Sequence, residues 1–297
     1  MRLPDFLVIG AMKAGTTSLC RDLESQPGIF FPSVKEPHTL CLDDVLGHEG
    51  VRRYASLFRD ADADALCAEG STGYTKLPTH KGVVDRARRV LGKDLKLIYI
   101  VREPISRSIS HHYHEYRAGD APRDFMSALR RDPMLAFVSK YAMQLRPWID
   151  AFGLEQVYVI KFEDYVWNRV ETVAATCRFL GVNPTPLIPT DQHVHNSGEQ
   201  TLLPPVGISN LVRKITRSQW YKRNVHPRTP HWVRDRFKKT LYRPAAARPD
   251  PPSLDAVDFL LERLDRDWER LPAMLGSSRP FWDVDSERRK YDALAAV

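Results

Sequence analysis

Short apolar runs alternate with longer amphipathic stretches through the first 182 residues of the chain. Apolar runs that end at glycine or polar residues are typical of buried strands, and apolar residues at helical spacing are typical of helices. The runs that we assign to strands are residues 6–9, 29–31, 65–69, 96–101 and 157–162. Because these strands alternate with helices, the pattern predicts an α/β fold, a three-layer sandwich around a central parallel sheet.

The intervening segments carry helix signals. Pro104 suits the first turn of a helix, Gly181 suits the end of one, and Ser253 is a good N-cap. We predict helices over 17–25, about 79–91, from 104 onward, 141–152, up to about 180, and from 254 onward. Two apolar stripes at helical spacing are expected to be buried, one of Ile105, Ile109, Tyr113 and Tyr116, the other of Leu254, Val257, Leu261, Leu264 and Trp268.

The first strand runs into a turn of small residues, Gly10-Ala-Met-Lys-Ala-Gly15. Glycine lets the backbone approach a ligand closely, and the free N–H groups at the start of the next helix attract anions. The layout predicts a P-loop-like phosphate-binding turn formed by Lys13, Ala14, Gly15, Thr16, Thr17 and Ser18. It departs from the P-loop pattern G-x-x-x-x-G-K-[ST], because Thr16 stands where that pattern has lysine.

A second group of polar residues follows other predicted strands. Arg102 comes directly after strand 96–101, and Ser110 lies eight residues further, about two helical turns away. Ligands of open α/β sheets bind outside the carboxyl ends of the strands, so Lys13 and Arg102 are expected to face one crevice. Lys35 and Glu36 precede a proline, which disfavours helix and predicts an extended or turn segment.

Length and composition indicate one domain over residues 1–297, with an α/β core at 1–182 and a loop, a basic segment and mostly helical structure at 183–297. The four cysteines are scattered, without metal-site spacing, so we expect reduced thiols and no metal. No apolar run approaches the roughly 20 residues that span a bilayer, and no leader-like sequence precedes the first strand. We therefore expect a cytoplasmic protein.

Positive charge is concentrated near the C-terminal third of the chain. The whole chain has a net charge of +7, yet segment 207–248 alone holds twelve Lys or Arg and one acid. Such a field attracts an anionic cofactor, an acidic glycan, a membrane surface or nucleic acid. Tryptophan and tyrosine within the segment could stack on sugars or bases, and a solvated helix docked on the domain explains the pattern equally well.

In order and spacing these motifs resemble the sulfotransferases that use 3′-phosphoadenosine 5′-phosphosulfate (PAPS), and most closely the heparan sulfate type with its bacterial relatives. The likeness covers nearly the whole chain. The residues that carry it are the turn 10–18, Lys35-Glu36-Pro37, Glu69 to Tyr74, Val101 to Pro104 with Ser110, the helix with Tyr141, Gln144, Leu145 and Trp148, and Phe162-Glu163-Asp164.

The resemblance implies a transferase that binds two phosphate groups of one nucleotide. Residues that match Lys13 to Ser18 wrap the 5′-phosphosulfate in this family, and those that match Arg102 and Ser110 hold the 3′-phosphate. On this basis we assign Lys13 to the leaving-group oxygens and Glu36 to the general base. Adenosine 3′,5′-bisphosphate would be the second product, and the reaction needs no metal. The acceptor would be a small molecule, a glycan or a glycolipid.

The chain departs from the family pattern at three places, two on the acceptor side and one on the cofactor side. His38-Thr39-Leu40 replaces the paired aromatics, Gly70 replaces a lysine, and residues 195–198 replace the Lys-Gly-Arg cofactor clamp. The residues that we expect to contact the acceptor are Lys35, His38, Tyr74 and His112. The acceptor's identity, and sulfation of oxygen or of nitrogen, stay open.

Two other functions remain open at this point. The first turn would also suit a P-loop kinase or ATPase. Against this, the chain has Thr16 where that class has a lysine and Arg102 where it has an aspartate. A non-enzymatic module could bind anionic polymers or membranes through segment 207–248. For the transferase we expect no nucleic-acid partner, while peripheral contact with an anionic membrane and the oligomeric state stay open.

Overall fold

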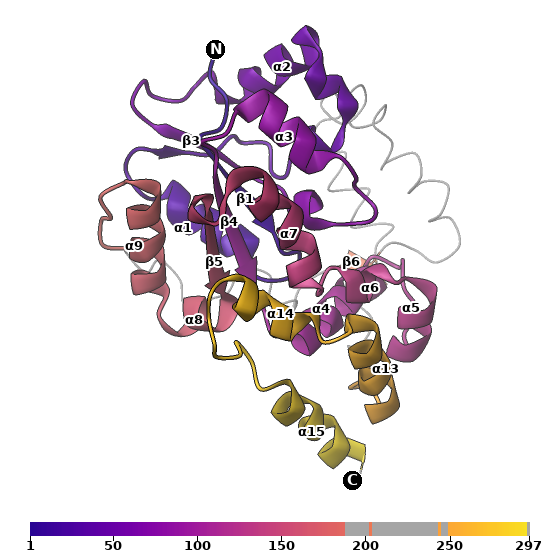
Figure 1. Ribbon diagram of the computed structural model, residues 1–297. Helices are drawn as coiled ribbons and strands as arrows, with labels where there is room; N and C mark the ends of the chain where they lie inside the picture. Colours follow the sequence, from indigo (N-terminus) through magenta and orange to yellow (C-terminus); the bar gives the residue numbers. More distant parts are fainter. Residues whose placement is uncertain (188–201, 204–242, 245–248, 296–297) are drawn as a thin grey trace.

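The computed structural model describes residues 1–187, 202–203, 243–244 and 249–295 (Figure 1). At its centre is a five-stranded sheet with strand order β2-β3-β1-β4-β5, in which every pairing is parallel. The strands are β1 (Phe6–Gly10), β2 (Ile29–Phe30), β3 (Leu66–Gly70), β4 (Lys96–Val101) and β5 (Val157–Lys161). The predicted α/β fold with a central parallel sheet is confirmed, and the five predicted strands match within one residue at each end.

Helices cover both faces of this sheet (Figure 1). On one side α1 (Thr16–Glu24) packs against α9 (Arg169–Leu180), and on the other α3 (Val83–Leu91) packs against α7 (Tyr141–Phe152). The residues of β1 are all buried, because both faces of a parallel sheet are covered. These contacts complete the three-layer sandwich. Two further helices on this part of the chain are α2 (His48–Ala55) and α8 (Phe162–Trp167).

A second apolar cluster joins the middle of the chain to its C-terminal part. It combines residues of α4 (Pro104–Arg117), α5 (Phe125–Arg131) and α6 (Met134–Phe137) with residues of α13 (Leu254–Leu264) and α15 (Val284–Ala295). Its fully buried members include Ile105, Leu129 and Leu260. The helical part after residue 182 therefore shares a core with helices that precede it.

Polar contacts hold the C-terminal part against α7 and α8. Asp267, at the start of α14 (Asp267–Met274), accepts hydrogen bonds from the N–H groups of Ala142 and Met143 at 2.8 and 3.0 Å. Glu163 accepts the Trp282 indole N–H at 3.0 Å and the backbone N–H of Glu103 at 2.8 Å. Glu163 thus ties the C-terminal part to the segment that follows β4.

Three helix predictions need correction. The stripe expected on α4 is wrong beyond Ile105, because Ile109, Tyr113 and Tyr116 are only partly buried while polar residues such as Arg107 and Ser108 are buried. This face of α4 covers the polar turn after β1. Helix α3 begins at Val83, after the left-handed Gly82, and Trp268 lies on α14 because α13 ends at Leu264 before two residues with positive φ.

Other predicted signals are confirmed. Ser253 caps α13 by accepting the N–H of Ala256 at 3.3 Å, and Gly181 ends α9 in the left-handed conformation. All four cysteines are free.

The remaining described pieces are small. Within the described residues no helix is long and apolar enough to cross a membrane. Strands β6 (Leu202–Leu203) and β7 (Arg243–Pro244) form a separate antiparallel pair. Two predicted segments lie outside the described residues, apart from these two strands. They are the loop after residue 187, which contains the altered family motif at 195–198, and the basic segment 207–248.

Candidate functional site

The turn between β1 and α1 is shaped to receive an anion. Lys13 and Gly15 both have left-handed backbone conformations, with φ of 69° and 94°. A side chain at Gly15 would lie 2.8 Å from the Phe162 ring, so glycine is required there. Helix α1 begins at Thr16, which presents its first free N–H groups to the turn. The hydroxyl oxygen of Ser18 is buried without a hydrogen-bond partner, as expected of a group that serves a ligand.

Cations from several elements converge on this turn. Burial lowers the pKa of Lys13, and the charges of Arg102, Arg117, Lys35 and Arg107 lower it further. These five side chains come from the turn itself, the end of β4, helix α4 and the segment before Pro37. Because these cationic side chains repel one another, a bound anion would relieve the repulsion. The structure thus places Lys35 near Lys13 and Arg102, the two residues that we expected to face one crevice.

Arg107 supports the turn from within the protein. Its guanidinium is fully buried and donates to Ser139 Oγ at 2.5 Å, to the Met12 carbonyl at 3.4 Å and to the Leu135 carbonyl. Burial lowers the pKa of Arg107 to about 10. The contact with Met12 fixes the backbone next to Lys13.

Arg102 and Ser110 occupy the expected positions at the end of β4 and on α4. The guanidinium of Arg102 lies 4.8 Å from the centre of the Phe162 ring, and its carbonyl accepts the Tyr141 hydroxyl at 2.6 Å. Glu103 caps α4 by accepting the N–H groups of Ile105 and Ser106 at 2.9 and 2.6 Å. These contacts hold the start of α4, and Ser110 is half-buried further along the helix.

The carboxylate of Glu36 is held in place and kept ionised. Glu36 and His38 both have left-handed backbone conformations, with φ of 49° and 53°. Thr72 Oγ1 donates to Glu36 Oε2 at 2.9 Å, and His38 Nε2 lies 3.4 Å from the same oxygen. Burial raises the pKa of Glu36, but the contacts with His38 and Thr72 more than offset this and hold it below its ordinary value. A carboxylate so placed is ready to accept a proton.

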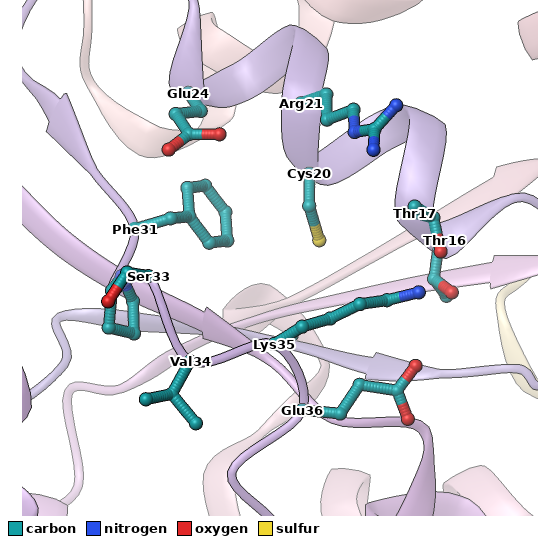
Figure 2. A pocket seen from close by; sticks show the side chains of 12 residues that line it. Thr16, Thr17, Cys20, Arg21, Glu24, Phe31, Ser33, Val34, Lys35 and Glu36 are labelled. Atoms are coloured by element: carbon teal, nitrogen blue, oxygen red, sulfur yellow. The ribbon is translucent and has the colours of Figure 1, made fainter. Parts of the chain in front are cut away.

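One cavity joins this carboxylate to the start of α1 (Figure 2). Its volume is about 240 Å³, and it is lined by Thr16, Thr17, Cys20, Arg21, Glu24, Phe31, Pro32, Ser33, Val34, Lys35, Glu36 and Gly70. Figure 2 shows the Lys35 side chain extending toward Thr16, with the Glu36 carboxylate on the same side of the cavity. A molecule in this cavity can therefore reach both the anion-binding turn and Glu36.

Two of the residues that we expected at the acceptor lie elsewhere. Tyr74 is buried, its hydroxyl donates to Glu69 and accepts the Leu40 N–H at 3.3 Å, and it does not line the Glu36 cavity. His112 is buried beside Phe125, and its Nε2 lies 2.8 Å from the Pro122 carbonyl. It lines a separate cavity of about 400 Å³ between α4 and residues of the C-terminal part, among them Pro249 and Tyr291. We therefore leave Tyr74 and His112 out of the proposed site.

The sequence patterns missed three residues of the site: Arg107, Arg117 and Thr72. We assigned the α4 stripe to apolar residues and did not consider that a buried arginine could brace the turn. Arg107 lies three residues before Ser110, a helical spacing that could have drawn attention to it. Thr72 follows β3, and the strand-end rule that singled out Arg102 applies to it equally.

A parallel sheet whose carboxyl edge gathers cations around a glycine turn defines an α/β protein that binds phosphate-like groups. The family follows from comparison with known proteins: the chain belongs to the sulfotransferase domain family, whose model matches residues 3–202. This membership gives no support to the kinase or ATPase hypothesis, or to a purely non-enzymatic module.

Individual relatives agree with this assignment. The chain is 26% identical over 205 residues to heparan sulfate glucosamine 3-O-sulfotransferase 3A1 of Mus musculus, covering 65% of this chain and 49% of the relative. It is 27% identical over 265 residues to heparan sulfate glucosamine 3-O-sulfotransferase 6 of Mus musculus, covering 82% and 70%. The chain spans about half the length of the first of these relatives.

A solved structure supports the fold. A sulfotransferase from Alicyclobacillus acidocaldarius superposes with a TM-score of 0.62 at 22% identity, covering 97% of this chain and 100% of that one. At this identity the likeness shows the fold alone.

Proposed function

We propose that this protein transfers the sulfuryl group of PAPS to a hydroxyl or amine of an acceptor. The observation that carries the proposal is the single cavity that holds the Glu36 carboxylate, Lys35 and the N-terminus of α1. It lies beside the cations that surround Lys13. A base and an anion cradle next to one another are what in-line transfer of a charged group requires.

The residues present fit such a donor. The turn after β1 offers Lys13, the first N–H groups of α1 and the unpartnered hydroxyl of Ser18 to the 5′-phosphosulfate. Arg102 and Ser110 are the candidates for the 3′-phosphate, since an arginine fork suits a phosphate dianion. Arg117 adds a further cation, and its Nε is buried without a partner. The donor supplies the activated sulfuryl group.

In the proposed reaction the chain's own groups move one proton and stabilise charge. Glu36 accepts the proton of the acceptor's hydroxyl or amine, for which its ionised state is suited. Lys13 stabilises the negative charge that develops on the departing phosphate oxygen. Thr72 and His38 hold the Glu36 carboxylate in place. Lys35 extends across the same cavity and can contact the sulfonate.

The acceptor belongs to the broad class of small molecules, glycans and glycolipids. The names of the relatives given above describe heparan sulfate glucosamine as their acceptor, which motivates a glycan here. Two of the altered positions lie at this site, since Gly70 lines the cavity and His38 contacts Glu36, so the relatives' acceptor does not carry over to this chain directly.

The donor class can be tested without an acceptor. Thermal unfolding should show a higher midpoint with adenosine 3′,5′-bisphosphate than with adenosine 5′-monophosphate, because ligands of the native state stabilise it. Arg102→Ala should remove most of this difference. Arg53→Ala is the matched control, since Arg53 is an exposed arginine that pairs with Asp44. Stronger stabilisation by ATP with Mg²⁺ than by adenosine 3′,5′-bisphosphate would contradict the proposal.

A further inference from the structure

We infer that the cavity beside Glu36 takes an uncharged acceptor, a hydroxyl compound with an apolar face, and selects against anionic polysaccharides. The inference rests on the proposed function, because it concerns the acceptor of that same reaction. Three features of the described lining carry it: balanced charge, an apolar wall and a position closed to a cation.

The charges of the lining give no net attraction for an anion. Among the described residues that line the cavity, Arg21 and Lys35 are cationic and Glu24 and Glu36 are anionic. The Cys20 thiol lies beside these groups: burial raises its pKa, the carboxylates of Glu36 and Glu24 raise it further, and the charge of Lys35 lowers it. A polyanion entering here would meet carboxylates at least as often as cations.

One wall of the cavity is apolar. It consists of Phe31, Pro32, Val34 and the Cys20 thiol. The Phe31 ring packs edge-on against Phe6 of β1, with ring centres 5.9 Å apart and planes at 86°, so its orientation is fixed. Figure 2 shows this ring facing Cys20. Burial raises the pKa of the Cys20 thiol to about 12, so it stays neutral. An aromatic ring of this kind stacks on the apolar face of a sugar or of an aryl group.

The end of β3 closes this wall to a cation. A side chain at Gly70 would lie 2.6 Å from Cys20 Sγ, so a longer residue could be placed there only by displacing the thiol. At Gly70 the backbone itself forms the wall, so this part of the lining carries no charge.

The size of the cavity limits what enters. Its volume of about 240 Å³ is below the roughly 300–1,000 Å³ of sites that enclose a whole drug-sized ligand. The reacting ring fits inside, and the rest of the acceptor extends past Val34, whose side chain is half exposed at the rim. An alkyl or aryl group joined to the reacting ring would contact this exposed apolar surface.

The test compares acceptors that differ in one carboxylate. Octyl β-glucoside and octyl β-glucuronide share ring, linkage and chain, and are assayed below their micellar concentrations with labelled PAPS. We expect kcat/KM to favour the glucoside by at least about tenfold, because its rival must desolvate a carboxylate against an apolar wall in a lining that holds as many carboxylates as cations. The variant Glu24→Gln should narrow this ratio. An N-sulfated heparan oligosaccharide should be a poorer acceptor than the glucoside.

A second variant isolates the apolar wall. Phe31→Ala should raise KM for octyl β-glucoside, whereas Phe31→Tyr keeps an aromatic ring and should have a KM close to that of the unaltered protein. The midpoint shift caused by adenosine 3′,5′-bisphosphate should be unchanged in both variants, since the ring is on the acceptor side. Two results would overturn the inference. One is transfer to the glucuronide or the oligosaccharide that equals or exceeds transfer to the glucoside. The other is transfer to neither glycoside by a protein that binds adenosine 3′,5′-bisphosphate. If the unaltered protein does not bind adenosine 3′,5′-bisphosphate, the proposed function itself is overturned.

Discussion

Removing the hydroxyl of Thr72 should shift the pH dependence of the reaction. Thr72 Oγ1 donates at 2.9 Å to Glu36 Oε2, and this hydrogen bond helps to hold the pKa of Glu36 below its ordinary value although burial raises it. A carboxylate with a depressed pKa stays ionised until the pH falls below that pKa. Without the donor the pKa rises, so Thr72→Val should lose activity at a higher pH than the unaltered protein.

The size of the shift follows from the contact. Hydrogen bonds to charged groups contribute about 1.5–3 kcal/mol, and one pKa unit corresponds to about 1.4 kcal/mol. The Glu36 side chain is 28% exposed, so water can replace part of the lost bond. We therefore use the lower limit and expect the acid limb of kcat/KM to move up by about one unit.

The assay is the pH profile of kcat/KM between about pH 3.5 and 8, with circular dichroism at each pH to show that the fold persists. Thr72→Ser keeps the donor and should leave the acid limb in place. An unmoved limb in Thr72→Val would refute the reasoning, as would an equal displacement in Thr72→Ser. Either result would mean that Thr72 does not act through the ionisation of Glu36.

Three further predictions concern stability and binding. Arg107→Met should lower the free energy of unfolding by about 3 kcal/mol or more in urea, because the Met12 and Leu135 carbonyls lose a buried partner, and Arg107→Lys should lie in between. Gly15→Ala should weaken adenosine 3′,5′-bisphosphate binding in calorimetry, because its methyl group would lie 2.8 Å from the Phe162 ring at a φ of 94°. Burial raises the pKa of Glu69 to about 7, so the folded state binds an extra proton between the ordinary value of 4.5 and 7. Stability should fall as the pH rises through that window, and thermal unfolding of Glu69→Gln should show a flatter profile.

Local chemistry made the first turn and the positions of the strands easy to predict. A turn with glycine and lysine after an apolar strand is typical of an anion-binding site, and Arg102 follows β4 directly. The rule that ligands bind at strand ends therefore located the turn and Arg102. The motif around Lys35 and Glu36 was found by family resemblance, and the structure joins it to the start of α1 through one cavity.

Tertiary contacts explain what the sequence did not reveal. The buried face of α4 carries Arg107 because that face supports the polar turn after β1, and periodicity alone assigned the helix an apolar stripe. Tyr74 shares a motif with acceptor-side residues, yet its hydroxyl is directed at the buried Glu69. Thr72 acts on Glu36 across 36 positions in the sequence, and only the fold brings such residues together.

The most direct test of the account is transfer from labelled PAPS by the unaltered protein, by Glu36→Gln and by Lys13→Ala, with octyl β-glucoside as acceptor. A positioned general base contributes about 10²–10⁴ in rate, so Glu36→Gln should lower kcat by that factor while its midpoint shift with adenosine 3′,5′-bisphosphate stays the same. Lys13→Ala should lose both turnover and nucleotide binding. Undiminished turnover in Glu36→Gln would contradict the account.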